Sequence, residues 1–196
     1  MKKLLVLSLL LVAVNAFAFP GGDDTLGLYT DMELGVNTLT TTTPFEAVEL
    51  YVLLTNPTYT GASGYEFQII TEGAITAPAW NLEGIQPLNV FAAPLFAVGL
   101  GEGNLAIYPN EFDACHLVTY SAFVLVPGDI VNFYIVPLES GGSWDPANIG
   151  YADALNAGNL PTAVPSSGAF EFKIFSINGL VADEAVSFGA VKALFN

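Results

Sequence analysis

The chain has 196 residues, of which 53% are hydrophobic and 12% are charged, and its formal net charge is −15. This acidic balance argues against nucleic acid, anionic membranes and phosphorylated ligands as partners, because little positive charge is present to neutralise them. Charged residues make up about 25% of ordinary soluble domains, so we expect solvated faces built from neutral polar and exposed apolar side chains. Such surfaces are poorly protected against self-association.

The first 18 residues, MKKLLVLSLLLVAVNAFA, have the pattern of a signal peptide. Two lysines precede an apolar core from Leu4 to Val14, and Ala16-Phe17-Ala18 supplies the small-x-small pattern of a cleavage site. The alternative, a retained anchor, is disfavoured because this core is too short to cross about 30 Å of hydrocarbon as a helix. We therefore expect a secreted, periplasmic or cell-surface protein. Its mature chain, residues 19–196, would form a single domain with no transmembrane segment.

Removal of the signal peptide leaves Lys173 and Lys192 as the only basic residues. Against 19 carboxylates, these two lysines give the mature chain a formal net charge of −17. Cations such as Ca²⁺ suit this charge better than anions. Cys115 is the only cysteine, so no intramolecular disulfide can form. Its apolar surroundings favour a buried thiol, with an intermolecular bridge or a reactive thiol as the alternatives.

Strand patterns dominate the mature chain. The first is expected at Leu26–Asp31, and EAVELYVLLT at 46–55 then places four aliphatic residues, Val48 to Leu54, on one face. A polar loop, TNPTYTGASG, precedes GYEFQII, whose Tyr65, Phe67 and Ile69 alternate with Glu66 and Gln68. We interpret these two strands as a hairpin that builds core, whose loop at 55–64 is free to take part in recognition.

Further strands are expected at 90–100, at 115–126 and over IVNFYIV at 130–136. Pro127-Gly128-Asp129 favours a tight turn between the last two. Residues 144–165, rich in proline and glycine, are interpreted as a long connection. FEFKIFSI at 170–177 alternates, and short pieces follow at 185–188 (strand) and 189–195 (helical turn). This succession predicts an all-β protein, an antiparallel sandwich of jelly-roll or immunoglobulin type with about nine strands.

The sequence lacks an obvious catalytic group. His116 is the only histidine, and its neighbour Cys115 points to the opposite face of a strand, so the two cannot act as base and nucleophile. Motifs of serine hydrolases, phosphate-binding loops and zinc proteases are absent. Glu111 and Asp113 are the closest carboxylate pair with aromatic neighbours, and they keep a secreted glycoside hydrolase open as an alternative. We predict a protein that is not an enzyme.

The sequence suggests two candidate binding sites. Asn110, Glu111 and Asp113 offer a fragment of a Ca²⁺ site, although no complete calcium loop is present, and no other cofactor is expected. Five aromatic residues in or beside predicted loops suggest a stacking platform for sugar or peptide, with closure of the core ends as the alternative. They are Tyr59, Trp80, Tyr108, Trp144 and Tyr151.

The stretch VELYVLLTNPTYTGASGYEFQIITEG resembles the opening of cohesin-like bacterial domains, in which a glycine precedes an aromatic-x-Phe strand. Later segments, including Pro127-Gly128-Asp129 and FEFKIFSINGLV, are similar in outline, and the resemblance covers about residues 26–182. The ending, SFGAVKALFN, is similar to that of uncharacterised exported bacterial proteins. The resemblance implies a nine-stranded jelly roll that binds protein or carbohydrate without catalysis. The resemblance does not imply dockerin binding for this chain, because cohesins that recruit dockerins belong to multi-domain scaffolds, whereas a single domain is expected here.

The sequence thus favours an exported binding or structural module of the envelope or the extracellular space. Its alternatives are a self-assembling surface subunit and the carboxylate-based glycoside hydrolase.

Overall fold

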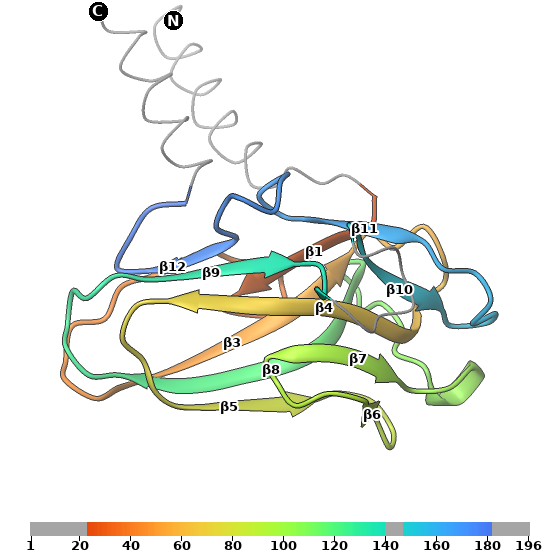
Figure 1. Ribbon diagram of the computed structural model, residues 1–196, viewed down its shortest axis with the longest axis horizontal. Coiled ribbons are helices and arrows are strands. Elements are labelled where there is room, and N and C mark those ends of the chain that lie inside the picture. Colours follow the sequence, from red (N-terminus) through yellow and green to blue (C-terminus); the bar gives the residue numbers. More distant parts are fainter. Residues whose placement is uncertain (1–22, 140–146, 182–196) are drawn as a thin grey trace, which may run out of the picture.

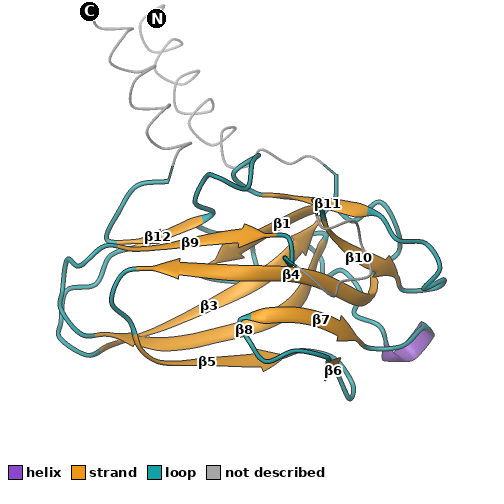
Figure 2. Ribbon diagram, viewed as in Figure 1, coloured by secondary structure: helices purple, strands orange, loops and turns teal. Residues whose placement is uncertain are grey.

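A computed structural model describes residues 23–139 and 147–181 of the chain. In this part of the chain regular structure is almost entirely β-strand, and η1 (Gly103–Leu105), a 3-10 turn, is the one helical element (Figure 2). The strands are β1 (Thr25–Tyr29), β2 (Thr38–Leu39), β3 (Glu46–Thr55), β4 (Ala62–Glu72), β5 (Thr76–Leu82), β6 (Leu88–Asn89), β7 (Leu95–Gly99), β8 (Ala114–Val124), β9 (Val131–Val136), β10 (Ile149–Asp153), β11 (Thr162–Pro165) and β12 (Phe175–Ile177).

The all-β prediction is confirmed, but the pairing of the strands is more complex than a simple antiparallel arrangement. The twelve strands form one hydrogen-bonded sheet with the order β2-β12-β9-β4-β10-β11-β1-β3-β8-β5, and β6 and β7 branch from it at β4. Most pairs are antiparallel, whereas β1 with β11 and β2 with β12 are parallel. The described residues therefore hold a mixed sheet, and the expected nine antiparallel strands are not what is observed.

The sheet folds over so that β9, β4 and β7 lie across β3, β8 and β5 (Figure 1). Three contacts join the two parts through the core. The Tyr65 hydroxyl on β4 donates to the Leu117 carbonyl on β8 at 2.9 Å. Tyr120 on β8 meets Phe133 on β9, and Trp80 on β5 meets Phe96 on β7, each with ring centroids 5.5 Å apart. One continuous apolar core therefore forms between the two parts.

Strand β3 follows its predicted alternation. The four aliphatic residues Val48, Leu50, Val52 and Leu54 are at most 2% exposed and belong to the main core. Leu53 points the other way, into a small second cluster with Tyr29 and Ala114. Period-two patterning thus correctly assigned the inward face of this strand.

The predicted hairpin of β3 and β4 is wrong. β3 pairs with β1 and β8, while β4 pairs with β7, β9 and β10, so the connecting residues 56–61 cross from one part of the sheet to the other. An apolar face that points to the core is equally compatible with pairing side by side and with facing across the core. The alternation in the sequence therefore could not separate the two arrangements.

The turn at 127–129 has the predicted geometry but a different place in the fold. The Asp129 amide donates to the Val126 carbonyl at 3.2 Å, and Gly128 has φ 86°, the left-handed conformation that glycine adopts without strain. The turn connects β8 to β9, which do not pair with each other. It is therefore a second crossing between the two parts of the sheet.

Two further segments differ from expectation. Residues 147–165 contain β10 and β11, although 144–165 was predicted as a connection. All five residues of β10 are buried, so its sequence, IGYAD, shows no alternation to detect. In 170–177 only Phe175–Ile177 is strand, and Phe172, expected to point inward, is 49% exposed. Strand β5 was not predicted, because Pro78 interrupts it at a bulge, a position that proline takes at sheet edges.

Several predictions fall outside the described residues. The signal peptide, Trp144, the strand at 185–188 and the helical turn at 189–195 all belong to this group. Within residues 23–139 and 147–181, the structure contains no helix with the length and apolar character needed to traverse a bilayer.

Candidate functional site

The aromatic residues suggested as a platform have different environments. Trp80 packs against Tyr120 and Phe96, with ring centroids 4.2 and 5.5 Å apart, and so belongs to the edge of the core. Tyr151 is fully buried on β10, whereas Tyr59 and Tyr108 are 39% and 45% exposed. Two of the four described residues therefore contribute to the core. Binding through Tyr59 and Tyr108 stays a prediction.

The loop between β3 and β4 is held in place by Asp24. Its carboxylate accepts hydrogen bonds from the Thr58 amide and the Thr58 hydroxyl, each at 2.7 Å, and from the Tyr151 hydroxyl. The Tyr151 hydroxyl also accepts from the Tyr59 amide at 3.3 Å. Burial, together with the hydrogen bond to Asp24, raises the pKa of Tyr151. We call Asp24, Thr58, Tyr59 and Tyr151 the Asp24 latch. It holds in place the loop for which the sequence suggested a part in recognition, and that part stays a prediction.

The suggested Ca²⁺ ligands lie in the turn before β8, where Asn110 serves the turn itself. Its side-chain oxygen accepts from the amides of Phe112 and Ala114 at 2.8 and 3.2 Å, and its side-chain nitrogen donates to the Met32 carbonyl. Glu111 and Asp113 are exposed. The described ranges contain no group of three acidic, histidine or cysteine side chains arranged for a metal ion, and Ca²⁺ binding stays a prediction.

Cys115 and His116 point to opposite faces of β8, as the alternation predicts. Cys115 is buried in the main core, and this burial raises the pKa of its thiol to about 12. The protonated thiol predominates at neutral pH and is a poor nucleophile. The two residues therefore cannot form a catalytic pair.

His116 lies on the outer face of β8 among polar side chains. Its Nε2 is 3.0 Å from the Thr119 hydroxyl and 3.8 Å from the Glu83 carboxylate, and its ring makes a T-shaped contact with Tyr51. The Thr119 hydroxyl donates to Glu83 at 2.9 Å. Partial burial lowers the pKa of His116, and the charges of Glu83 and Glu49 oppose this shift without cancelling it.

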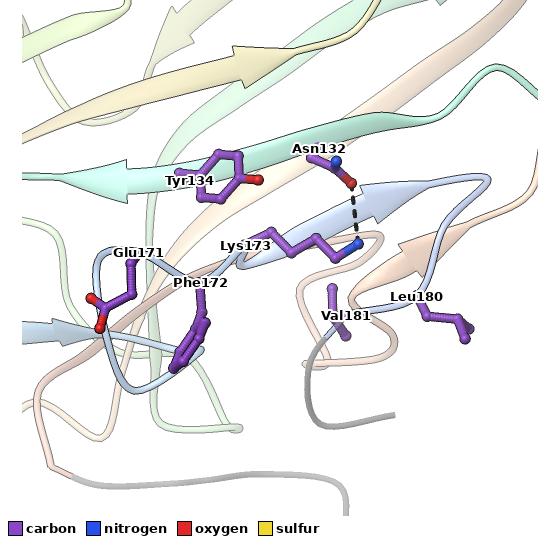
Figure 3. Close-up of a pocket in the computed structure, with 7 residues that line it drawn as sticks. All are labelled: Asn132, Tyr134, Glu171, Phe172, Lys173, Leu180 and Val181. Atoms are coloured by element: carbon purple, nitrogen blue, oxygen red, sulfur yellow. Dashed lines mark hydrogen bonds between the residues drawn. The ribbon is translucent and has the colours of Figure 1, made fainter. Parts of the chain in front are cut away.

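A pocket of about 370 Å³ lies on the outer side of β9, beside both ends of β12 (Figure 3). Seven residues line it, and we call it the Lys173 pocket. They are Asn132, Tyr134, Glu171, Phe172, Lys173, Leu180 and Val181. Its volume falls within the range of about 300–1,000 Å³ that is usual for ligand sites.

The sequence builds this pocket from three short segments. Because β9 alternates, its residues Val131, Phe133 and Ile135 enter the core, and the side chains of Asn132 and Tyr134 between them face outward. Before β12 the chain makes a turn, in which the Phe172 amide donates to the Ala169 carbonyl at 3.2 Å. Phe172 and Lys173 thereby project beside β9. Leu180 and Val181, after β12, complete the rim opposite Phe172 (Figure 3).

The polar groups of the pocket are ordered by hydrogen bonds. The Lys173 ammonium lies 3.4 Å from the side-chain oxygen of Asn132, which also accepts from the Ser176 hydroxyl at 2.8 Å. The Tyr134 hydroxyl donates to Glu72 at 2.9 Å, and burial and this carboxylate raise its pKa. Sequence reasoning missed the pocket, since it treated Lys173 as a residue on the solvated face of a strand. The rarity of basic residues was the available signal.

No protein-family model, curated protein or solved structure was found to match this chain. The resemblance to cohesin-like domains therefore stays a prediction.

Proposed function

We propose that this protein is an exported binding module that catalyses no reaction and holds its ligand in the Lys173 pocket. The observation that carries the proposal is the combination of one ammonium, one carboxylate, two neutral polar groups and exposed apolar side chains around a surface pocket of ligand size. Ligand pockets typically combine an apolar lining with a few such polar groups that fix orientation.

The proposal of a non-enzymatic role is supported by the separation of reactive groups. Cys115 is buried away from His116, and the carboxylate nearest to the histidine, Glu83, is engaged by Thr119. The Lys173 pocket contains neither histidine nor cysteine.

The proposed architecture is a jelly-roll sandwich of cohesin-like type. Its support is the path of the chain, because β3, β4, β5, β7, β8 and β9 alternate between the two facing parts of the sheet. Export is supported by the pattern of the first 18 residues, and the proposed location is the periplasm, the cell surface or the medium.

The proposal is tested by screening glycan and peptide arrays with the purified full chain, with and without Ca²⁺. We expect saturable binding that is lost in Phe172→Ala and kept in Phe45→Ala. Phe45 is a matched control, since it is also exposed, at 69%, and does not line the pocket. Equal loss in both variants would contradict the assignment of the pocket. Turnover of a polysaccharide that disappears in Glu111→Gln would favour the glycoside hydrolase instead.

Self-association is a second candidate function, and strand β5 favours it. β5 ends the hydrogen-bonded order of the described sheet, and its sequence, TAPAWNL, carries no charge. Uncharged edge strands are open to pairing with another chain, although Pro78 and its bulge oppose this. The neighbouring edge of β7 is closed. There the Asn89 side chain pairs with the Ala97 amide and the Leu95 carbonyl, each at 2.9 Å.

Sedimentation of the protein over a range of concentrations tests this second candidate. Concentration-dependent oligomers that are abolished by Ala79→Lys, a charge placed on β5, would support it. A monomer at all concentrations would contradict it.

A further inference from the structure

The chemistry of the Lys173 pocket also defines a class of ligand, and this step rests on the binding function proposed above. Lys173 is the only basic residue among those that the structure describes. An ammonium has three hydrogen-bond donors. Among the described residues, the Lys173 ammonium has one hydrogen-bond partner, the neutral side chain of Asn132. The described residues place no carboxylate oxygen within 4.0 Å of this ammonium. Its charge is thus available to a ligand. Because the chain is strongly acidic, an anionic group is favoured only in direct contact with this ammonium, against repulsion from the rest of the surface.

The charges around the pocket limit it to holding one anionic group of a ligand at a time. Glu171 lines the pocket, and Glu72 lies beside it through its hydrogen bond to Tyr134. A dianionic phosphate would meet one ammonium and two carboxylates, and like charges at such short range repel. A single carboxylate carries less charge, so the Lys173 ammonium can offset its repulsion from Glu171 and Glu72.

The remaining groups favour a ring that carries hydroxyls. The exposed carboxylate of Glu171 accepts hydrogen bonds, and the Tyr134 oxygen keeps acceptor capacity beyond the proton it gives to Glu72. Phe172, 49% exposed, presents an aromatic ring at the rim, and Leu180, 55% exposed, lies on the other side (Figure 3). An aromatic ring suits the C–H face of a sugar, while the acceptors suit its hydroxyls.

We propose that the Lys173 pocket binds a uronic acid residue of an acidic polysaccharide. The ligand carboxylate would pair with the Lys173 ammonium, ring hydroxyls would donate to Glu171 and Tyr134, and the apolar face of the sugar would lie on Phe172. Asn132, held by Ser176, orients the ammonium toward the pocket.

The test is calorimetric titration of the full chain with trigalacturonate and with the matched neutral galactose trisaccharide. We expect the trigalacturonate to bind at least tenfold more tightly. Lys173→Met should weaken trigalacturonate binding at least tenfold, while Lys173→Arg, which keeps the charge, should retain most of it. Lys192→Met is the matched control, because it removes the same charge elsewhere in the sequence, and we expect no change.

The salt dependence of binding provides a second measurement. Raising the NaCl concentration from about 0.01 to about 1 M shortens the Debye length from about 30 to about 3 Å, so a contact between charges weakens. We expect the affinity for trigalacturonate to fall with salt in the wild type and in Lys173→Arg. In Lys173→Met it should rise with salt, because screening relieves the repulsion between the anionic ligand and the acidic chain. Circular dichroism of each variant confirms folding.

Three outcomes would overturn this inference. The first is equal affinity for the charged and neutral trisaccharides, which would leave the general binding function intact. The second is loss of binding in Lys192→Met but not in Lys173→Met, which would show that the ligand does not bind at Lys173. The third is binding of hexanoate as tightly as trigalacturonate, which would show that the pocket recognises a carboxylate and not a sugar ring. If no glycan or peptide on the arrays binds the protein, the proposed binding function itself would be overturned.

Discussion

The Asp24 latch and the Lys173 pocket both contain a charged group and a tyrosine, yet they differ in how fully their polar groups are used. In the latch, the Asp24 carboxylate receives three hydrogen bonds from Thr58 and Tyr151, so its capacity is largely spent within the fold. In the pocket, Lys173 has a single neutral partner among the described residues. A charged group whose hydrogen bonds are all made within the protein contributes to stability. A charged group that still has unused hydrogen-bond donors or acceptors can bind a ligand.

The largest effect is expected from Asp24→Ala. This change leaves the Thr58 amide and the Tyr151 hydroxyl without their acceptor, and it should lower the free energy of unfolding by about 2–3 kcal/mol. Chemical denaturation measures the loss. Asp23→Ala is the control, since this neighbour is exposed and should change stability by less than about 0.5 kcal/mol. Equal effects of the two substitutions would show that the latch contributes nothing.

Two buried tyrosines in the core allow the same comparison between a hydroxyl that is hydrogen-bonded and one that is not. The Tyr65 hydroxyl bonds to the Leu117 carbonyl, while the buried Tyr120 hydroxyl has no hydrogen-bond partner among the described residues. Tyr65→Phe should therefore destabilise the protein by about 1 kcal/mol, and Tyr120→Phe should cost nothing or increase stability. Denaturant titration of both variants distinguishes them. A larger loss for Tyr120→Phe than for Tyr65→Phe would contradict the distinction between used and unused groups.

His116 is expected to produce a smaller effect that depends on pH. Burial lowers its pKa in the folded protein below the ordinary value of 6.5, so the unfolded chain binds the proton more readily. The resulting stability is present above pH 6.5 and is lost as the pH falls through 6.5 and the folded-state pKa. The carboxylates of Glu83 and Glu49 moderate this loss, and Thr119 and Tyr51 complete the surroundings of the ring.

The measurement is the free energy of unfolding between pH 8 and pH 5 for the wild type and for His116→Gln. The variant should show a weaker decline in stability than the wild type, since the contribution of His116 is absent. Carboxylates titrate in both proteins and cancel in the difference. A steeper decline in the variant would mean that the charged histidine is favoured by Glu83, and the sign of the shift would be wrong.

The smallest effect on stability is expected from Lys173→Met. Its ammonium has one long contact, at 3.4 Å to Asn132, and its loss should change the free energy of unfolding by less than about 0.5 kcal/mol. Thermal or denaturant unfolding checks this. A loss of more than about 1 kcal/mol would show that Lys173, like Asp24, stabilises the fold.

The sequence specified the fold where its pattern had a single interpretation. Alternation assigned the inward face of β3, and proline followed by glycine located the turn at 127–129. It could not decide which strands pair, because β3 and β4 satisfy the same pattern across the core as they would side by side. It also could not detect β10, whose residues are all buried, so that the chain shows no polar face.

The pocket was not predictable for a related reason. Lys173 and Phe172 lie in a stretch that alternates perfectly, which favoured a strand with Phe172 in the core. In the structure the strand begins only at Phe175, and the turn before it projects both side chains beside β9. Whether an alternating stretch forms a strand depends on a neighbour being available to pair with it, and that neighbour is chosen by the fold as a whole.

Along the outer edge of β7, the short strand β6 pairs with Val98 and Gly99, and the Asn89 side chain continues this border by bonding to the Leu95 carbonyl and the Ala97 amide. That second part of the border rests on one side-chain amide, so a single replacement would uncover two unpaired main-chain groups. Whether copies of this molecule could also pair along β7 would then depend on the identity of one position, a control far simpler to alter in evolution than the insertion or removal of a strand.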